Sequence, residues 1–167
     1  MPKLLDSFPK AYTDANVCMK AVQVWKQAGE RIVFTNGCFD LLHIGHIAYL
    51  KEARSLGDRL IIGVNSDASV QRLKGEHRPI KDQENRLAIL SSLEMVDACL
   101  LFEEDTPYEI IQLIQPDILV KGGDWKVSEI VGSDIVLENG GSVQSLNFLE
   151  GYSTTKLEEK IKNHTDF

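Results

Sequence analysis

Cysteine is scarce in this sequence, and its spacing excludes two common kinds of small stabilised domain. Cys18, Cys38 and Cys99 are the only three in 167 residues, and no two of them form a Cys-x-x-Cys pair. An odd number of widely spaced cysteines argues against a disulfide framework or a cysteine zinc site. We therefore expect reduced thiols in a cytoplasmic protein, with Cys99 in the core and Cys38 also packed rather than reactive.

Long apolar runs and a broad basic surface are missing as well. The apolar stretches 60–64 and 98–102 have the length of strands rather than of a membrane span, and residues 1–10 do not resemble a signal peptide. The net charge of −7 disfavours a general nucleic-acid binder, whose affinity depends on excess positive charge. A nucleotide enzyme needs positive charge only locally, and residues 72–86 supply three arginines and two lysines.

Strand-like and helix-like segments alternate along the chain, without repeats or low-complexity stretches. The expected strands are 31–35, 59–65, 96–102, 116–121 and 143–148. The expected helices are 14–28, 45–55, 68–73, 82–93, one starting at Thr106-Pro107, and 153–163. In the first helix, the apolar stripe of Val17, Ala21, Val24, Trp25 and Ala28 is expected to face the core. The alternation predicts one α/β domain of three layers, with a five-stranded, mostly parallel sheet.

The segment 35–46 carries the strongest local signal. It reads Thr-Asn-Gly-Cys-Phe-Asp-Leu-Leu-His-Ile-Gly-His and joins a strand to a helix. Unpaired backbone N–H groups and the helix dipole favour an anion at such a helix start. His43 and His46 lie one turn apart on the same face, and Gly45 leaves space for a phosphate to approach the backbone. A pair of helix-capping histidines stays an alternative. Zinc binding is a weaker one, because no cysteine or acidic residue stands at ligand spacing nearby.

The pattern Gly37-x-Phe39-Asp40-x-x-His43-x-Gly45-His46 resembles the signature of the cytidylyltransferase-like nucleotidyltransferases. The resemblance implies a Rossmann-like fold of the HUP type over residues 31–163. Residues 1–30 would form an N-terminal extension whose amphipathic helix packs on this domain, and residues 164–167 a C-terminal tail. The catalytic residues implied by the resemblance are His43, His46 and Lys74.

Further motifs match this family in order along the chain, including 121–125 and 151–156, where Tyr152 replaces the usual isoleucine. The nucleotide-binding residues that the resemblance implies are Thr35, Asn36, Gly37, Phe39, Gly45, Asn65, Lys121, Gly123, Tyr152, Ser153, Thr154 and Thr155. The implied substrate-binding residues are Asp40, Arg86, Asp124 and Trp125. Three of the motif residues also have structural interpretations: Asp67 as a helix cap, Lys74 as a solvated lysine and Trp125 as a packing residue.

Within the family, the segments 121–125, 130–132 and 138–141 resemble the adenylyltransferases that make ADP-heptose. The resemblance implies transfer of AMP from ATP to a sugar 1-phosphate, D-glycero-β-D-manno-heptose 1-phosphate. It also implies Mg²⁺ held mainly by the triphosphate, no metal site built by the protein, and a homodimer or larger homo-oligomer. No nucleic acid or membrane partner is expected, and the short chain is expected to depend on a separate kinase for its sugar phosphate.

Three other functions stay open as alternatives. A cytidylyltransferase acting on glycerol 3-phosphate shares the Gly-Asp-Trp element at 123–125. A nucleotide-sensing module without chemistry would keep the fold, but its motifs would show damage, and here they are intact. A fragment of an aminoacyl-tRNA synthetase shares His-Ile-Gly-His, but it would need a longer chain and a second lysine-rich loop.

Overall fold

The computed structural model describes residues 4–147, 149 and 151–163, without the side chains of 155, 156, 162 and 163. The strands are β1 Ala11–Tyr12, β2 Ile32–Gly37, β3 Arg59–Asn65, β4 Ala98–Phe102, β5 Ile118–Gly122 and β6 Ser142–Leu146. The helices are α1 Ala15–Gln27, α2 Ile44–Ser55, α3 Asp67–Lys74, α4 Gln83–Ser91, α5 Tyr108–Ile114, α6 Ser133–Glu138 and α7 Thr154–Asn163, with short 3₁₀ turns η1 Leu4–Ser7 and η2 Val127–Glu129. The expected tail, 164–167, lies outside the described residues.

The sheet contains six strands in the described part of the chain, so the expectation of five was wrong. The strand order is β1-β4-β3-β2-β5-β6, and every recorded pairing is parallel. The additional strand, β1, has only two residues and pairs with β4 at the sheet edge. So short a strand carries no alternation for the sequence to show. It forms because tertiary contacts place it there, including a bond from the Lys10 ammonium to the Val96 carbonyl.

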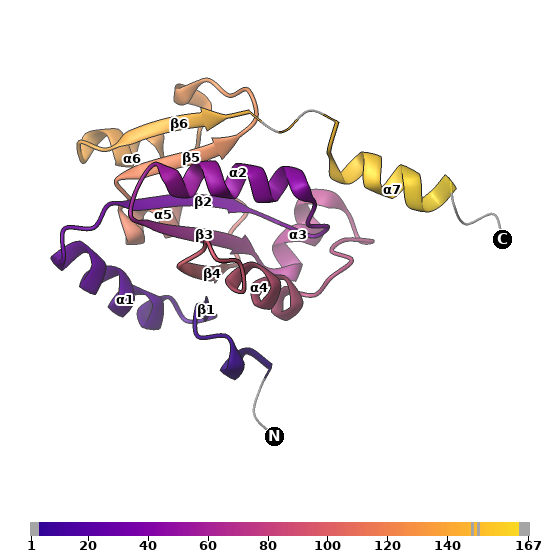
Figure 1. Cartoon of the computed structure of the whole chain (residues 1–167), viewed down its shortest axis with the longest axis horizontal. Helices are drawn as coiled ribbons and strands as arrows, with labels where there is room; N and C mark the ends of the chain where they lie inside the picture. Colours follow the sequence, from indigo (N-terminus) through magenta and orange to yellow (C-terminus); the bar gives the residue numbers. More distant parts are fainter. Residues whose placement is uncertain (1–3, 148, 150, 164–167) are drawn as a thin grey trace.

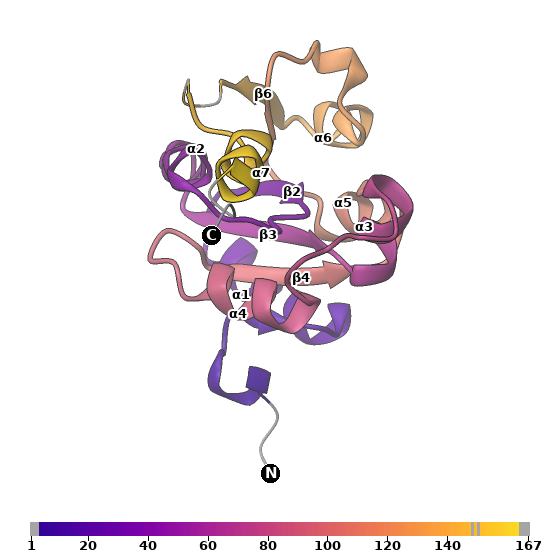
Figure 2. The same ribbon diagram turned by 90° about the vertical axis from the view of Figure 1, so that its right-hand side faces the viewer.

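Helices cover both faces of the sheet, which confirms the three-layer Rossmann-like fold (Figures 1 and 2). Side chains of α2 and α4, among them Leu50 and Leu87, pack on one face. Side chains of α1, α5 and α6, among them Val22 and Ile111, pack on the other. The nearly continuous apolar run of β3 follows from this arrangement, because its residues are buried on both faces.

Helix α1 forms where the sequence predicts it, with Asp14 as its N-cap, but of the expected stripe Trp25 packs against the core whereas Val17 and Val24 do not. Cys18 and Val22 are fully buried, whereas Val17 and Val24 of the predicted core stripe are 48% and 62% exposed. Both sets of residues have helical spacing, so periodicity alone does not choose between them. Packing against the apolar surface of the sheet determines which face of the helix is buried.

The structure also differs from the sequence predictions at the end of one strand and in one helix. Strand β2 continues through Asn36 and Gly37, which were expected to break it, because both pair with β3 opposite Gly63 and Val64. Helix α6 was not predicted at all and covers Ser133–Glu138. Its six residues are too few to display a clear helical period.

Candidate active site

A crevice opens in the sheet between β2 and β5. These strands pair only at Val33 with Ile118 and Phe34 with Leu119, although β2 continues to Gly37 and β5 to Gly122. The strand order also reverses here: β3 and β4 lie on one side of β2, whereas β5 and β6 lie on its other side. Open α/β sheets bind ligands at such a switch point, beyond the carboxyl ends of the strands.

A cavity of about 160 Å³ occupies this position. Most of its lining comes from residues that the sequence singles out, and they belong to β2, the loop after it, α2, α3, β5 and α7. The lining residues are Asn36, Gly37, Cys38, Phe39, Asp40, His46, Tyr49, Lys74, Lys121, Gly122 and Thr154. The tertiary structure thus brings together motifs that are more than a hundred residues apart in the sequence.

His43 and His46 are fixed at the start of α2 by a reciprocal capping arrangement. His43 Nδ1 accepts from the Gly45 N–H at 3.2 Å, and His46 Nδ1 accepts from the His43 N–H at 3.4 Å. The two ring centroids are 4.0 Å apart. Because each Nδ1 accepts, a neutral ring carries its proton on Nε2. Each imidazole therefore keeps one N–H that can donate to a ligand.

The electrostatic surroundings keep both imidazoles neutral. Burial, together with the nearby His43 and Lys74, lowers the pKa of His46 to about 4. Burial also lowers the pKa of His43. At neutral pH the pair therefore consists of two neutral hydrogen-bond donors. An anion bound between them would raise both pKa values, because it stabilises the protonated form.

The two glycines of the motif lie against aromatic rings of the same motif. A Cβ on Gly45 would lie 3.0 Å from the His43 ring, and the Gly45 N–H is already bonded to that ring. A Cβ on Gly37 would lie 2.9 Å from the ring of Phe39, which is itself in the left-handed region at φ 48°. The Phe39 ring in turn lies 5.5 Å from that of His46. Gly45 therefore leaves space for the His43 ring, and the phosphate approach expected at this glycine stays a prediction.

Two expected nucleotide-binding residues are buried beneath the site. Thr35 is fully buried and shares a 2.6 Å hydrogen bond with the hydroxyl of Tyr49. Asn65 is 3% exposed and donates to Ser69 Oγ at 3.0 Å. Neither side chain has a surface that a nucleotide can reach, so the direct contacts expected from the sequence do not fit. Both residues instead support the ends of β2 and β3.

Asp40, expected to bind substrate, holds the loop before α4. Its carboxylate accepts from the backbone N–H groups of Ile80 and Lys81 at 2.9 Å and from the Arg78 guanidinium at 2.7 Å. Burial alone would raise the pKa of Asp40, but the hydrogen bonds from Lys81, Ile80 and Arg78 lower it. Arg78 also forms an ion pair with Glu158 of α7. Asp40 and Arg78 therefore connect the first motif to the last helix.

Arg86, the other expected substrate ligand, is completely buried. Its guanidinium donates to the carbonyls of Cys38 and Asn65, each at 2.7 Å. It also donates to the Lys81 carbonyl at 3.1 Å and to the Asp67 carboxylate at 2.7 Å. With its donors directed at these internal partners, Arg86 cannot contact a substrate. It ties together the loops that follow β2 and β3 and the loop that precedes α4.

Two lysines provide positive charge at the cavity. Lys74 ends α3 and Lys121 lies near the end of β5, and neither forms an ion pair within the described residues. Burial lowers the pKa of Lys121. Lys121 lies 5.9 Å from the ring centroid of Trp125, whose indole N–H donates to the Gly122 carbonyl at 3.1 Å. Ammonium groups without a carboxylate partner favour an anionic ligand.

The motif at residues 151–156 lies beside the histidine pair. Thr154 lines the main cavity, while His43, Tyr152 and Ser153 line an adjoining cavity of about 110 Å³. Figure 1 shows α7 on the side of the sheet where the strands end. The side chain of Thr155 lies outside the described part of the chain. Asp124 is exposed, Gly123 donates its N–H to the Leu146 carbonyl at the end of β6, and neither residue lines the main cavity.

Comparison with known proteins assigns the family. The family described as "Cytidylyltransferase-like" matches residues 34–160, which include the motifs at 35–46 and 151–156. The chain belongs to the cytidylyltransferase-like family of nucleotidyltransferases. It is 59% identical over 135 residues to the bifunctional protein HldE of a Nitratiruptor species, covering 81% of this chain and 28% of that protein. It is 61% identical over 142 residues to HldE of Haemophilus influenzae (strain PittEE), covering 85% and 30%. The chain thus spans less than a third of these relatives.

A solved structure supports the same assignment. The lipopolysaccharide core biosynthesis protein from Thermoplasma volcanium GSS1 superposes with a TM-score of 0.60 and is 35% identical in sequence. The match covers 75% of this chain and 100% of that protein. At this identity the likeness extends beyond the fold to the family.

Tyr49 is a cavity residue of this cytidylyltransferase-like chain that the sequence did not single out. It is 4% exposed, lies three residues after His46 on α2 and donates to the Val120 carbonyl at 3.4 Å. Burial raises its pKa to about 12, so it stays protonated. Its position one turn after His46 was the sequence signal that could have identified it.

Cys38 is half-buried, and burial raises the pKa of its thiol, which agrees with a packed rather than reactive cysteine.

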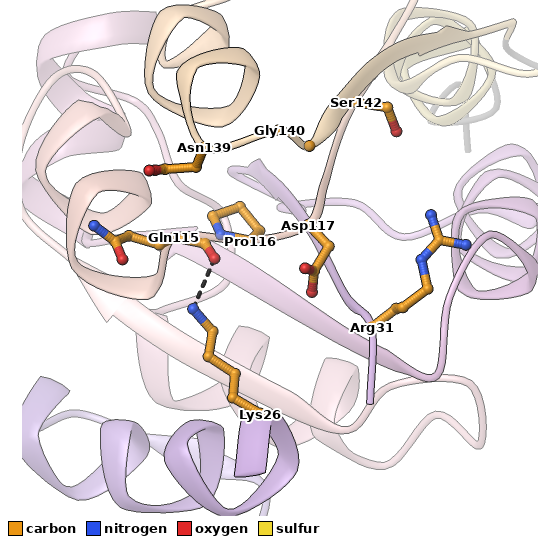
Figure 3. Close-up of a pocket in the computed structure, with 9 residues that line it drawn as sticks. Lys26, Arg31, Gln115, Pro116, Asp117, Asn139, Gly140 and Ser142 are labelled. Carbon is orange, nitrogen blue, oxygen red and sulfur yellow. Dashed lines mark hydrogen bonds between the residues drawn. The ribbon is translucent and has the colours of Figure 1, made fainter. Parts of the chain in front are cut away.

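A larger cavity of about 400 Å³ lies at the opposite edge of the sheet, where β2, β5 and β6 begin (Figure 3). Figure 3 shows Lys26 directed at the Gln115 carbonyl, to which it donates at 2.7 Å, and Arg31 extending away from it. The cavity contains none of the expected site residues. Parallel sheets bind ligands at the other edge, so the smaller cavity at the switch point is the candidate active site.

Within residues 4–147, 149 and 151–163, no helix combines the length and apolar character needed to cross a membrane. The same residues contain no group of three or more histidine, cysteine or acidic side chains placed to hold a metal ion.

Proposed function

We propose that this chain transfers AMP from ATP to D-glycero-β-D-manno-heptose 1-phosphate, giving ADP-heptose and pyrophosphate. The observation that carries the proposal is the pair of neutral imidazoles, whose Nε2–H donors have no recorded partner in the described part of the chain, at a crevice with two lysines that form no ion pair there. The choice of a heptose phosphate rests on the resemblance of 121–125, 130–132 and 138–141 to ADP-heptose-forming enzymes. The likeness to a lipopolysaccharide core biosynthesis protein supports it.

The reaction is a single in-line displacement. A phosphate oxygen of the sugar phosphate attacks the α-phosphorus of ATP, a new P–O bond forms, and the bond to pyrophosphate breaks. The attacking phosphate monoester is largely dianionic at neutral pH, so no general base is needed. Catalysis then consists of positioning and of stabilising charge on the transferred phosphoryl group. His43 and His46 donate their Nε2–H groups to its oxygens, where the negative charge grows.

The remaining residues hold the two substrates. Lys74 and Lys121 neutralise phosphate charge, and the hydroxyl-rich start of α7 around Ser153 and Thr154 receives the triphosphate. The Mg²⁺ implied by the family resemblance would be held mainly by the triphosphate, since the Asp40 carboxylate of the motif is bonded to Ile80, Lys81 and Arg78. When bound, Mg²⁺ would reduce the negative charge on the phosphates.

Pyrophosphate release tests the function directly. The wild type would be assayed with ATP and with CTP, each with Mg²⁺, against heptose 1-phosphate and glycerol 3-phosphate. We expect turnover with ATP and heptose 1-phosphate, its loss in His46→Ala, and near wild-type rates in His77→Ala, where the histidine is exposed and outside the cavity. Turnover only with CTP and glycerol 3-phosphate would replace the proposal by the cytidylyltransferase alternative. Silence with all four pairs would refute both.

The cytoplasmic location and the homo-oligomeric state stay predictions from the sequence. Light scattering tests the second of these, and a solution mass equal to the 18.7 kDa of one chain would contradict it.

A further inference from the structure

The two strands that flank the crevice separate at one register position. The recorded pairing of β2 with β5 ends at Phe34 and Leu119, and the same register places Thr35 opposite Val120 next. No pairing of β2 with β5 is recorded at that position in the described part of the chain. Thr35 and Val120 each stay paired on their other side, with β3 and β6 respectively. The crevice therefore begins where the backbone bonds between the two central strands stop.

A tyrosine hydroxyl joins the two strands at this position. Tyr49 Oη lies 2.6 Å from Thr35 Oγ1 and 3.4 Å from the Val120 carbonyl oxygen. A carbonyl oxygen can only accept, so Tyr49 donates to Val120 and the Thr35 hydroxyl donates to Tyr49. Thr35 and Val120 are fully buried and Tyr49 is 4% exposed. These two bonds form a hydroxyl bridge from β2 through Tyr49 to β5.

Packing alone does not account for a tyrosine here. A phenylalanine would fill the same space in the core cluster that contains Tyr49 without burying a polar group. A buried hydroxyl costs free energy unless it forms hydrogen bonds, and the net gain from those bonds is small. The hydroxyl of Tyr49 therefore points to a role other than stability.

The hydroxyl bridge lies next to the groups assigned to the phosphates. The residues that follow it on β2 and β5 are Asn36 and Lys121, and both line the main cavity. Tyr49 itself lies three residues after His46 on α2. The bridge thus connects the three elements β2, β5 and α2, which carry cavity residues on different sides of the crevice.

We propose that Tyr49 is a positioning residue whose hydroxyl fixes the spacing between the imidazole pair on α2 and Lys121 on β5. The inference rests on the proposed function, in which both sides act on one transferred phosphoryl group. A small change in spacing leaves each side able to attract phosphate, so binding persists. The alignment for the displacement is lost, and a misplacement of about 1 Å can lower a rate by about a hundredfold. Tyr49 therefore acts on kcat rather than on KM.

Removing either hydroxyl tests the bridge. Tyr49→Phe and Thr35→Val each keep the shape of the side chain, and each is expected to lower kcat by about tenfold with both KM values within about threefold of wild type. The double variant should be no slower than either single variant, because all three break the same bridge, whereas independent effects would multiply to about a hundredfold. Thr35→Ser keeps the hydroxyl and should retain a kcat near that of wild type.

Tyr12→Phe is the matched control. It removes the same hydroxyl group from a part-buried tyrosine, but Tyr12 lies in the edge strand β1 and does not line the cavity. Its kcat should equal that of wild type.

The variant at Thr35 distinguishes positioning from direct contact, because a fully buried side chain cannot touch a substrate. A loss of kcat in Tyr49→Phe that Thr35→Val does not share, or that multiplies in the double variant, would overturn the bridge and leave the function in place. An unchanged kcat in both single variants, with a lower urea midpoint, would show a purely structural role and would also overturn the inference.

Hydrogen exchange separates failure of this inference from failure of the proposed function. The backbone amides of 35–37 and 120–122 are expected to exchange about tenfold faster in Tyr49→Phe and Thr35→Val than in wild type and Tyr12→Phe. Equal exchange in all four proteins would overturn the bridge, whether or not the wild type is active. Faster exchange in the two bridge variants, with no wild-type turnover of any substrate pair, would support the bridge and refute the function alone.

Discussion

Replacing Arg86 by methionine should destabilise the fold strongly, because the guanidinium connects three loops from a fully buried position. Methionine keeps the apolar stem but removes every donor. The change leaves the carbonyls of Cys38, Asn65 and Lys81 without this donor and breaks the ion pair with Asp67. Removing one partner of a buried ion pair costs about 3–5 kcal/mol. Because Asp67 is 34% exposed and can turn to water, we expect a loss near the lower limit, about 3 kcal/mol.

Urea denaturation followed by tryptophan fluorescence measures this loss. A decrease of about 3 kcal/mol is a large part of the total stability of such a domain, which is about 5–15 kcal/mol. Arg72→Met is the matched control, since Arg72 is 49% exposed and its ion pair with Asp105 should contribute at most about 1 kcal/mol. An Arg86→Met protein within about 1 kcal/mol of wild type, at an unchanged denaturant slope, would refute the structural role given to Arg86.

Three further predictions concern the site. The pKa of His46 is about 4 in the folded chain, against 6.5 for an ordinary histidine. As the pH decreases between these two values, the unfolded state binds a proton that the folded state does not. The free energy of unfolding therefore falls as the pH decreases. His46→Phe should flatten that decline in urea midpoints between about pH 7 and about pH 5, and parallel pH profiles would contradict it. Arg78→Gln breaks the link between Asp40 and Glu158, so the KM for ATP should rise by about threefold or more while the KM for the acceptor stays constant. Equal rises in both KM values would count against this role of Arg78. Gly45→Ala forces the His43 ring to move, so kcat should fall by about tenfold or more with little change in thermal midpoint, and an unchanged kcat would show that the ring position is unimportant.

The local pattern of the sequence was enough to predict the fold class, and it singled out most of the residues that line the crevice cavity. Strands such as β3 and helices such as α4 carry complete periodic signals, and Asp82 caps α4 as its position suggests. The segment 35–46 predicted a strand, a turn and a helix start with two imidazoles on one face, and the structure places them so. These features depend on neighbours within a few residues, and the sequence displays such neighbours directly.

Which motif residues face the crevice was decided only by the tertiary structure. Thr35 and Arg86 belong to family motifs, but their side chains are buried because α2 and the loops around α4 pack over them. The buried face of α1 and the two-residue strand β1 likewise depend on contacts with distant segments. A motif specifies which chemical groups are available. Burial and direction depend on residues far away in the chain, and only the folded sheet sets those.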